Sequence, residues 1–192
     1  MTPPTVGAFY WGNNNYFGGT HMNRHSFVLF GLMLVAVSSA PLRGADDRAT
    51  PQEVIAKVRQ AASELSKTHN VIQFNSRSGP WVWKDTYIFV VDCDKMVNAA
   101  HPVRADIRGV PMAAIKDAKG NAVYPDPAAF CEAARKPAGT WTEYWWVKAD
   151  ETQGSRKISY HLGAEGTPYV VAAGIYDDKL TIAQLSKLSA KR

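Results

Sequence analysis

The chain has 192 residues, of which 46% are hydrophobic and 20% are charged. This length accommodates one domain of ordinary size with a packed core, together with some additional sequence. The net charge of +5 arises from lysines and arginines that are scattered without a basic stripe, so we expect no nucleic-acid partner.

The N-terminal region is predicted to be a targeting segment. Arg24 precedes an apolar run at 26–37, and the small residues of 38–40 follow. This is the pattern of a secretory signal peptide, and the run is shorter than the roughly 20 residues that span a membrane. The alternatives are an uncleaved anchor and a buried core helix. We predict a signal peptide at 22–45, and therefore a periplasmic or secreted protein that is not membrane-embedded after cleavage.

The first 21 residues do not fit this arrangement. Residues 1–21 are rich in glycine, asparagine and aromatic residues and show neither helical nor strand periodicity. They would also make the signal peptide begin abnormally late in the chain. We therefore predict that translation begins at Met22 and that 1–21 is non-native or a wrongly assigned start. Residues 46–192 then form a single domain.

A long helix is predicted from Pro51 to about His69. Thr50 suits the N-cap, Pro51 suits the first helical position, and Glu53 can pair with the N-cap backbone amide. Apolar residues recur at three-and-four spacing along one side of this helix, and polar residues occupy the other. The apolar side consists of Val54, Ile55, Val58, Ala61, Ala62 and Leu65. We expect this helix to lie on the surface with its apolar side on the core.

Beyond the break at 79–80 the pattern changes to short runs rich in Val, Ile, Tyr and Trp, separated by turn residues. The predicted strands are 86–91, 96–100, 141–147, 157–162 and 169–176. The first two form a hairpin through 92–95. Short helices are predicted at 126–135 and 180–188. This order of elements predicts an α+β domain with an antiparallel sheet.

Several motifs follow one another along these elements. They are Trp83-Lys84-Asp85-Thr86-Tyr87, Asn98-Ala99-Ala100-His101-Pro102, Lys157-Ile158-Ser159-Tyr160 and Gly174-Ile175-Tyr176. Taken in order, they resemble the single Cache domain, an extracytoplasmic relative of the PAS sensor fold. The resemblance covers about 51–178 and implies a long N-terminal helix packed on a five-stranded antiparallel sheet.

The same resemblance implies a small-molecule-binding module. Single Cache domains are mostly sensor regions of chemoreceptors and histidine kinases, and several bind pyruvate, lactate or acetate. We therefore expect a standalone periplasmic sensor for a small anionic metabolite, acting through a separate membrane histidine kinase or chemoreceptor. An exported interaction protein with a filled pocket is the alternative. We expect neither an enzyme nor a cofactor, because no nucleophile elbow, paired carboxylates, zinc motif or phosphate loop occurs.

Lys157 and Tyr160 are candidate ligand residues on one predicted strand. Alternation places Lys157 and Ser159 on one face of the sheet, whereas Tyr160 points the other way unless a bulge intervenes. Lys157 is the better candidate for a carboxylate, because an ammonium group supplies charge and three hydrogen-bond donors. The alternative is a solvated lysine on an edge strand.

His101 and four aromatic residues complete the predicted site. Pro102 forces an extended backbone at His101, whose imidazole either donates to a carboxylate or satisfies a turn or a buried carbonyl. No residue lies at ligand spacing from it, so we expect no metal site. Tyrosine hydroxyls and indole amides can orient a polar solute, and most other aromatic side chains belong to the core. The aromatic pocket residues are predicted to be Trp83, Tyr87, Tyr144 and Trp146.

Cys93 and Cys131 are the two cysteines of the chain. An exported protein meets an oxidising compartment in which a disulfide persists. A bond between these two residues requires Cα atoms within roughly 7 Å of each other. The sequence leaves open whether they are paired.

Overall fold

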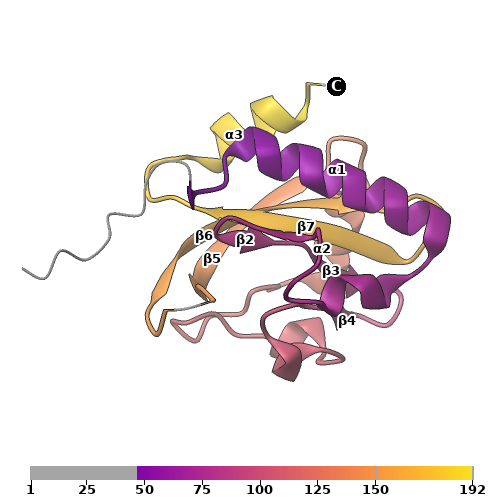
Figure 1. Ribbon diagram of the computed structural model, residues 1–192, viewed down its shortest axis with the longest axis horizontal. Coiled ribbons are helices and arrows are strands. Elements are labelled where there is room, and N and C mark those ends of the chain that lie inside the picture. The colour runs from indigo at the N-terminus through magenta and orange to yellow at the C-terminus, as the bar shows by residue number, and fades with distance from the viewer. Residues whose placement is uncertain (1–46, 150, 192) are drawn as a thin grey trace, which may run out of the picture. The chain divides into compact units, whose positions relative to one another are not determined.

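The computed structural model describes residues 47–149 and 151–191 of the chain (Figure 1). The predictions made for residues 1–21 and 22–45 lie outside the described residues. The described helices and strands are α1 (Pro51–Thr68), β1 (Val82–Trp83), β2 (Thr86–Tyr87), β3 (Phe89–Asp92), β4 (Val97–Ala100), α2 (Pro127–Ala134), β5 (Thr140–Val147), β6 (Gly154–Gly163), β7 (Tyr169–Tyr176) and α3 (Ile182–Ser189). Together they form an α+β domain, as predicted.

The long helix α1 begins and ends at residues that its sequence favours. The Thr50 side chain accepts a hydrogen bond from the Glu53 backbone amide at 3.2 Å, and the Glu53 carboxylate accepts one from the Thr50 amide at 2.8 Å. This reciprocal pair satisfies two amides that the first helical turn leaves free. The helix ends at Thr68, and the C-cap residue His69 has a φ of 54° and donates its backbone N–H to the Leu65 carbonyl at 2.9 Å.

Five strands form one antiparallel sheet in the order β4-β3-β7-β6-β5, and β1 and β2 pair separately. The strand predicted at 86–91 is divided between β2 and β3. The division falls at Ile88, whose backbone N–H donates to the Trp81 carbonyl at 2.8 Å. Strand β4 begins one residue later than predicted because Met96 has a φ of 53°, outside the extended region.

The two faces of the sheet are covered by different parts of the chain. Helices α1 and α3 lie on one side, and the connection from β4 to β5 lies on the other (Figure 1). We call residues 101–126 of this connection the cover segment. The face beneath α1 packs the apolar side of that helix against Ile88, Val90, Trp141, Ile158, Tyr160, Val171, Ala173 and Ile175. The predicted fold of a long helix on a five-stranded antiparallel sheet is therefore confirmed.

A disulfide joins the turn after β3 to helix α2. Cys93 and Cys131 are bonded, with Cα atoms 5.9 Å apart. Both sulfur-bearing residues are buried in the hydrophobic cluster beneath the cover segment. The bond therefore fixes α2, which follows the cover segment, to the β3–β4 hairpin, which precedes it.

Replacing both cysteines by alanine (C93A/C131A) should lower the free energy of unfolding by about 2–5 kcal/mol, because the disulfide closes a long loop in the unfolded chain. Urea unfolding of the oxidised wild type and the double variant measures this difference. The reduced wild type should match the variant. A loss below about 0.5 kcal/mol would mean that packing alone holds α2 in place.

Candidate ligand-binding site

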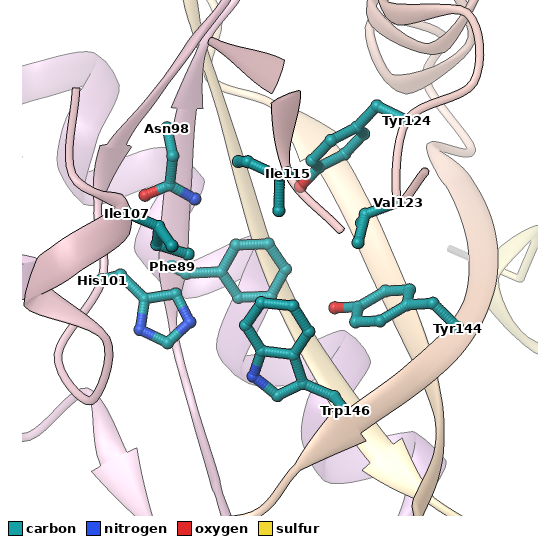
Figure 2. Close-up of a pocket in the computed structure, with 9 residues that line it drawn as sticks. All are labelled: Phe89, Asn98, His101, Ile107, Ile115, Val123, Tyr124, Tyr144 and Trp146. Carbon is teal, nitrogen blue, oxygen red and sulfur yellow. The ribbon is translucent and has the colours of Figure 1, made fainter. Parts of the chain in front are cut away.

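A small cavity lies between the sheet and the cover segment (Figure 2). Its floor comes from β3 and β5, and much of its roof comes from the cover segment. The volume that the centre of a water molecule can occupy there is about 10 Å³, so the cavity has room for roughly one water molecule. The lining residues are Phe89, Asn98, His101, Ile107, Ile115, Val123, Tyr124, Tyr144 and Trp146.

Strand β6 brings a row of polar side chains to the cavity side of the sheet. Successive side chains of a strand point to opposite faces, so Ile158 and Tyr160 pack under α1. Lys157, Ser159 and His161 point the other way, and all three are fully buried. Three polar residues at every second position of a buried strand are unusual, because buried polar groups must find partners.

Lys157 is surrounded by aromatic rings. Its Nζ lies 4.2 Å from the centre of the Tyr87 ring and 5.4 Å from the centres of the Phe89 and Tyr176 rings. These ring faces attract a cation but accept no ordinary hydrogen bond. Among the described residues, Nζ has no hydrogen-bond partner. We call Tyr87, Phe89 and Tyr176 the ring cage of Lys157.

Gly174 of β7 makes room for the lysine side chain. A Cβ atom at this position would lie 2.6 Å from Lys157 Cε and closer still to Ser159 Oγ. The Gly174 carbonyl also accepts a hydrogen bond from the Thr86 hydroxyl at 2.6 Å. The glycine is therefore needed for the close approach of Lys157 to the backbone of β7.

Burial controls the charges of the ionisable groups at the cavity. Burial lowers the pKa of Lys157 to about 7, and the charge of Asp85 partly opposes this shift. Burial and the charge of Lys157 lower the pKa of His161 to about 3. The pKa of His101 lies well below its usual value because of burial and of the charges of Lys157 and Arg104. Both histidines are therefore neutral near pH 7.

The orientation of His101 is set by backbone amides that follow it. Its Nδ1 accepts hydrogen bonds from the N–H groups of Val103 at 3.3 Å and Arg104 at 2.9 Å. The neutral ring therefore carries its proton on Nε2, which is a donor. The His101 backbone N–H donates to the Asn75 side chain at 3.0 Å, which anchors the start of the cover segment.

Hydroxyl groups supply further donors. The indole N–H of Trp146 donates to the Tyr87 hydroxyl at 3.0 Å, and the hydroxyls of Tyr144 and Ser159 lie 2.9 Å apart. Figure 2 shows the hydroxyls of Tyr124 and Tyr144 directed towards the middle of the cavity. Burial raises the pKa of both tyrosines, so these groups keep their protons at neutral pH.

The structure brings together most of the predicted ligand residues. His101, Tyr144 and Trp146 line the cavity. Tyr87 is bonded to Trp146, and Lys157 lies against the Tyr87 ring. Tyr87 and Lys157 do not line the cavity themselves, but these contacts join them to the three lining residues on the same side of the sheet.

Trp83 and Tyr160 do not reach the cavity, contrary to the prediction. Tyr160 lies under α1, with its ring centre 5.0 Å from that of Trp141, and its hydroxyl donates to the Ala138 carbonyl at 3.0 Å. No bulge turns it round, because β6 keeps regular register with β5 and β7. Trp83 packs against the same core from β1.

The prediction missed several residues on the cavity side. Ser159 and His161 share the face of Lys157, and the alternation of β6 was a usable signal for them. His161 contacts the hydroxyl of Thr142 at 2.9 Å through Nε2, and its Nδ1 has no partner in the described part of the chain. The cover-segment residues Ile115 and Tyr124 lie in irregular chain, for which periodicity gives no signal.

The described residues meet the requirements of neither a three-ligand metal site nor a membrane-spanning helix. Across 47–149 and 151–191, no three His, Cys, Asp or Glu side chains gather as metal ligands would. No helix in this part of the chain has both the length and the apolar character that crossing a membrane requires. The cavity itself is lined by aromatic, aliphatic and hydrogen-bond-donating groups.

A long helix on one face of a five-stranded antiparallel sheet and a small, largely apolar cavity on the other are features of a PAS-like α+β fold. The sequence matches the profile of the Cache domain family over residues 82–181, more than half of the chain. The protein therefore belongs to the Cache domain family, whose members are extracytoplasmic sensor domains. No curated protein sequence matches the chain.

Solved structures of chemosensory domains resemble it. One is a Cache chemosensory domain described for its recognition of carboxylic acids, with 22% identity, a TM-score of 0.44, and coverage of 62% of this chain and 71% of that chain. A methyl-accepting chemotaxis protein from Vibrio parahaemolyticus RIMD 2210633 has 26% identity, a TM-score of 0.40, and coverage of 65% and 74%. The periplasmic sensor domain of a chemotaxis protein has 17% identity, a TM-score of 0.45, and coverage of 67% and 90%.

Substituting Lys157 by methionine (K157M) should stabilise the ligand-free domain in a pH-dependent way. The unfolded chain keeps the lysine proton up to a pH of about 10.5, whereas the folded chain releases it near pH 7. Between these values the unfolded state binds more protons, so wild-type stability rises with pH. The advantage of K157M should therefore fall from about 5 kcal/mol at pH 6 to about 2 kcal/mol at pH 9.

Urea unfolding at both pH values measures this advantage. The matched control is Lys119→Met, because Lys119 is exposed and lies over the Trp145 ring with its Nζ 3.2 Å from the ring centre. This control should show the pH dependence of the wild type. An advantage of K157M that is equal at the two pH values would contradict a lysine that titrates near neutrality.

Adding one methyl group at Gly174 (G174A) should destabilise the domain by about 1–3 kcal/mol, because the new Cβ overlaps Lys157 and Ser159. Gly79→Ala is the matched control, since a Cβ there meets only ordinary contacts, the nearest to Ser76 Cβ at 3.5 Å. Chemical denaturation of both variants compares them. Equal stability of G174A and G79A would show that Lys157 moves aside without cost.

Proposed function

We propose that this Cache domain is an exported sensor module that binds a short-chain carboxylate, such as pyruvate, lactate or acetate. The observation that carries the proposal is Lys157, a fully buried amine without a hydrogen-bond partner among the described residues. An unpaired buried charge is costly, and a bound carboxylate would supply the missing acceptor and counter-charge. The ligand would enter the space next to the ring cage and Trp146.

The remaining polar groups support an anionic ligand. His101 offers Nε2–H, and Tyr124 and Tyr144 offer hydroxyls at the same cavity. No aspartate or glutamate is among the described residues that line it. The Asn98 side-chain oxygen, which also lines the cavity, has no hydrogen-bond partner among the described residues and can accept one from the ligand. The other polar groups are donors and, beside the cavity, a potential cation, and this combination without an acid favours carboxylates.

The family membership supports the location and the partner in this proposal. Cache domains are extracytoplasmic sensors, and the signal peptide predicted at 22–45 would export residues 46–192 as one domain. The exported domain is then periplasmic or secreted. It would report ligand occupancy to a separate membrane histidine kinase or chemoreceptor. Binding, and not catalysis, is its proposed activity.

A second candidate function has one observation in its favour. The cavity has room for roughly one water molecule, which is less than a three-carbon acid occupies. A domain whose interior is filled by Ile107, Ile115 and Tyr124 would serve as an interaction module without a ligand. The buried amine of Lys157 favours the carboxylate site over this alternative, because a filled interior gains nothing from an unpaired amine.

Acetate, lactate and pyruvate should each be tested for stabilisation of the purified domain. A ligand at one hundred times its dissociation constant stabilises the folded state by about 2.7 kcal/mol, which a thermal shift detects. K157M should weaken binding at least tenfold, because it removes the hydrogen bond from a charged donor. Isothermal titration calorimetry measures the dissociation constants of both proteins.

Lys119→Met is again the control, and it should bind as the wild type does. Equal affinity of K157M and the wild type would reject Lys157 as the carboxylate partner. If no carboxylate stabilises the domain, the filled-interior interaction module becomes the better description.

A further inference from the structure

The surroundings of Lys157 suit a neutral amine better than an ammonium ion. Its side chain is fully buried on the central part of β6, and its Nζ contacts the rings of Tyr87, Phe89 and Tyr176. These contacts replace only part of the hydration that an ammonium ion loses on burial. Gly174 lets the lysine side chain pack closely against β7, because a Cβ atom at that position would lie 2.6 Å from Lys157 Cε.

The tyrosines and histidines described around Lys157 have pKa values that lie away from neutral pH. Burial raises the pKa values of the facing tyrosines on β2, β5 and β7 and lowers those of the two histidines. The hydrogen bond to Asp106 raises the pKa of Arg104, and the Asp85 carboxylate accepts a hydrogen bond from the Ala49 amide at 2.9 Å. The titratable and charged groups around Lys157 and the cavity are Tyr87, Tyr144, Tyr176, His101, His161, Asp85, Arg104, Arg108 and Lys148.

We propose that the domain binds a carboxylate together with one proton, which Lys157 takes up, so that the site responds jointly to the carboxylate and to pH. The inference rests on the proposed carboxylate site. The proton passes from solvent to the lone pair of Nζ, and a ligand oxygen accepts the resulting N–H⁺ hydrogen bond. No covalent bond to carbon forms or breaks. The site therefore gains the components of the undissociated acid and stays neutral overall.

The expected pH response follows from the proton count. In the ligand-free domain the pKa of Lys157 is about 7, and a bound carboxylate would raise it by stabilising the ammonium form. Below this pH the lysine is already charged, so binding takes up little proton and the affinity is constant. Above it the complex holds more protons than the free domain. The affinity then falls by up to tenfold per pH unit.

Calorimetric titration of the wild-type domain with acetate and with pyruvate tests this inference directly. At a pH of about 8, two buffers of different ionisation enthalpy, Tris and HEPES, should give different apparent enthalpies. Their difference should correspond to uptake of about one proton per ligand. At a pH of about 6 the uptake should be much smaller, and the dissociation constant should be at least tenfold lower than at a pH of about 8.5.

Two variants separate Lys157 from the rest of the protein. Lys119→Met should keep the full pH dependence of binding. Lys157→Arg keeps a cation at all of these pH values, so any binding it retains should lose that dependence. The wild-type measurement decides the matter even if this second variant does not fold.

The outcomes distinguish this inference from the proposed function. Carboxylate binding with the same dissociation constant at both pH values, and without proton uptake, overturns the coupling and leaves the proposed function intact. Absence of acetate and pyruvate binding throughout this pH range overturns both. Proton uptake that persists in K157M would assign the proton to another group and overturn the role of Lys157.

Discussion

The cavity side of this domain is organised around one buried amine. Lys157 lies in the middle of a sheet where an aliphatic residue would pack at lower cost, and the surrounding residues adapt to it. Gly174 has no side chain, which leaves space for Lys157 against β7. The rings of Tyr87, Phe89 and Tyr176 surround the lysine Nζ. The hydrogen bond between Tyr87 and Trp146 then links this cage to the cavity.

The cover segment depends on the same arrangement, because it closes the polar face of the sheet. Backbone bonds tie it to β4 at Asn98, and the Asp117 carboxylate accepts the Trp145 amide of β5 at 3.2 Å. The disulfide between Cys93 and Cys131 holds its far end. The floor is a regular hydrogen-bonded sheet, whereas the roof is mostly irregular chain. A bound carboxylate, as proposed, would need more room than the cavity has, and it would then displace the irregular roof before the regular sheet.

The sequence was sufficient for the fold because local and long-range signals agree. The capping box at Thr50, the apolar side of α1 and the alternation of β6 each require the arrangement that is seen. Alternation also places Lys157 and Tyr160 on opposite faces, so a shared ligand contact requires a bulge between them. Strand β6 has no such bulge, and Tyr160 therefore points away from the cavity.

The positions of the roof residues could not be predicted from the sequence, for a different reason. Ile107, Ile115 and Tyr124 are placed by turns, short helices and a disulfide, and none of these has a period that sequence reveals. The division at Ile88 was equally hidden, because it depends on one backbone hydrogen bond to Trp81. The sequence thus predicts the orientation of side chains on regular strands. It does not predict the position of side chains that contacts with distant residues hold in place.

The cost of Lys157 is itself an argument about function. Sequences that fold well seldom bury an unpaired ionisable group, and those that do usually place it at a functional site. A methionine would fill the same volume and contact the same rings without a loss of hydration. An amine at this position lowers the stability of the ligand-free domain, and the carboxylate that we propose as ligand would offset that loss. The proposed site would then favour an acid over its neutral analogues.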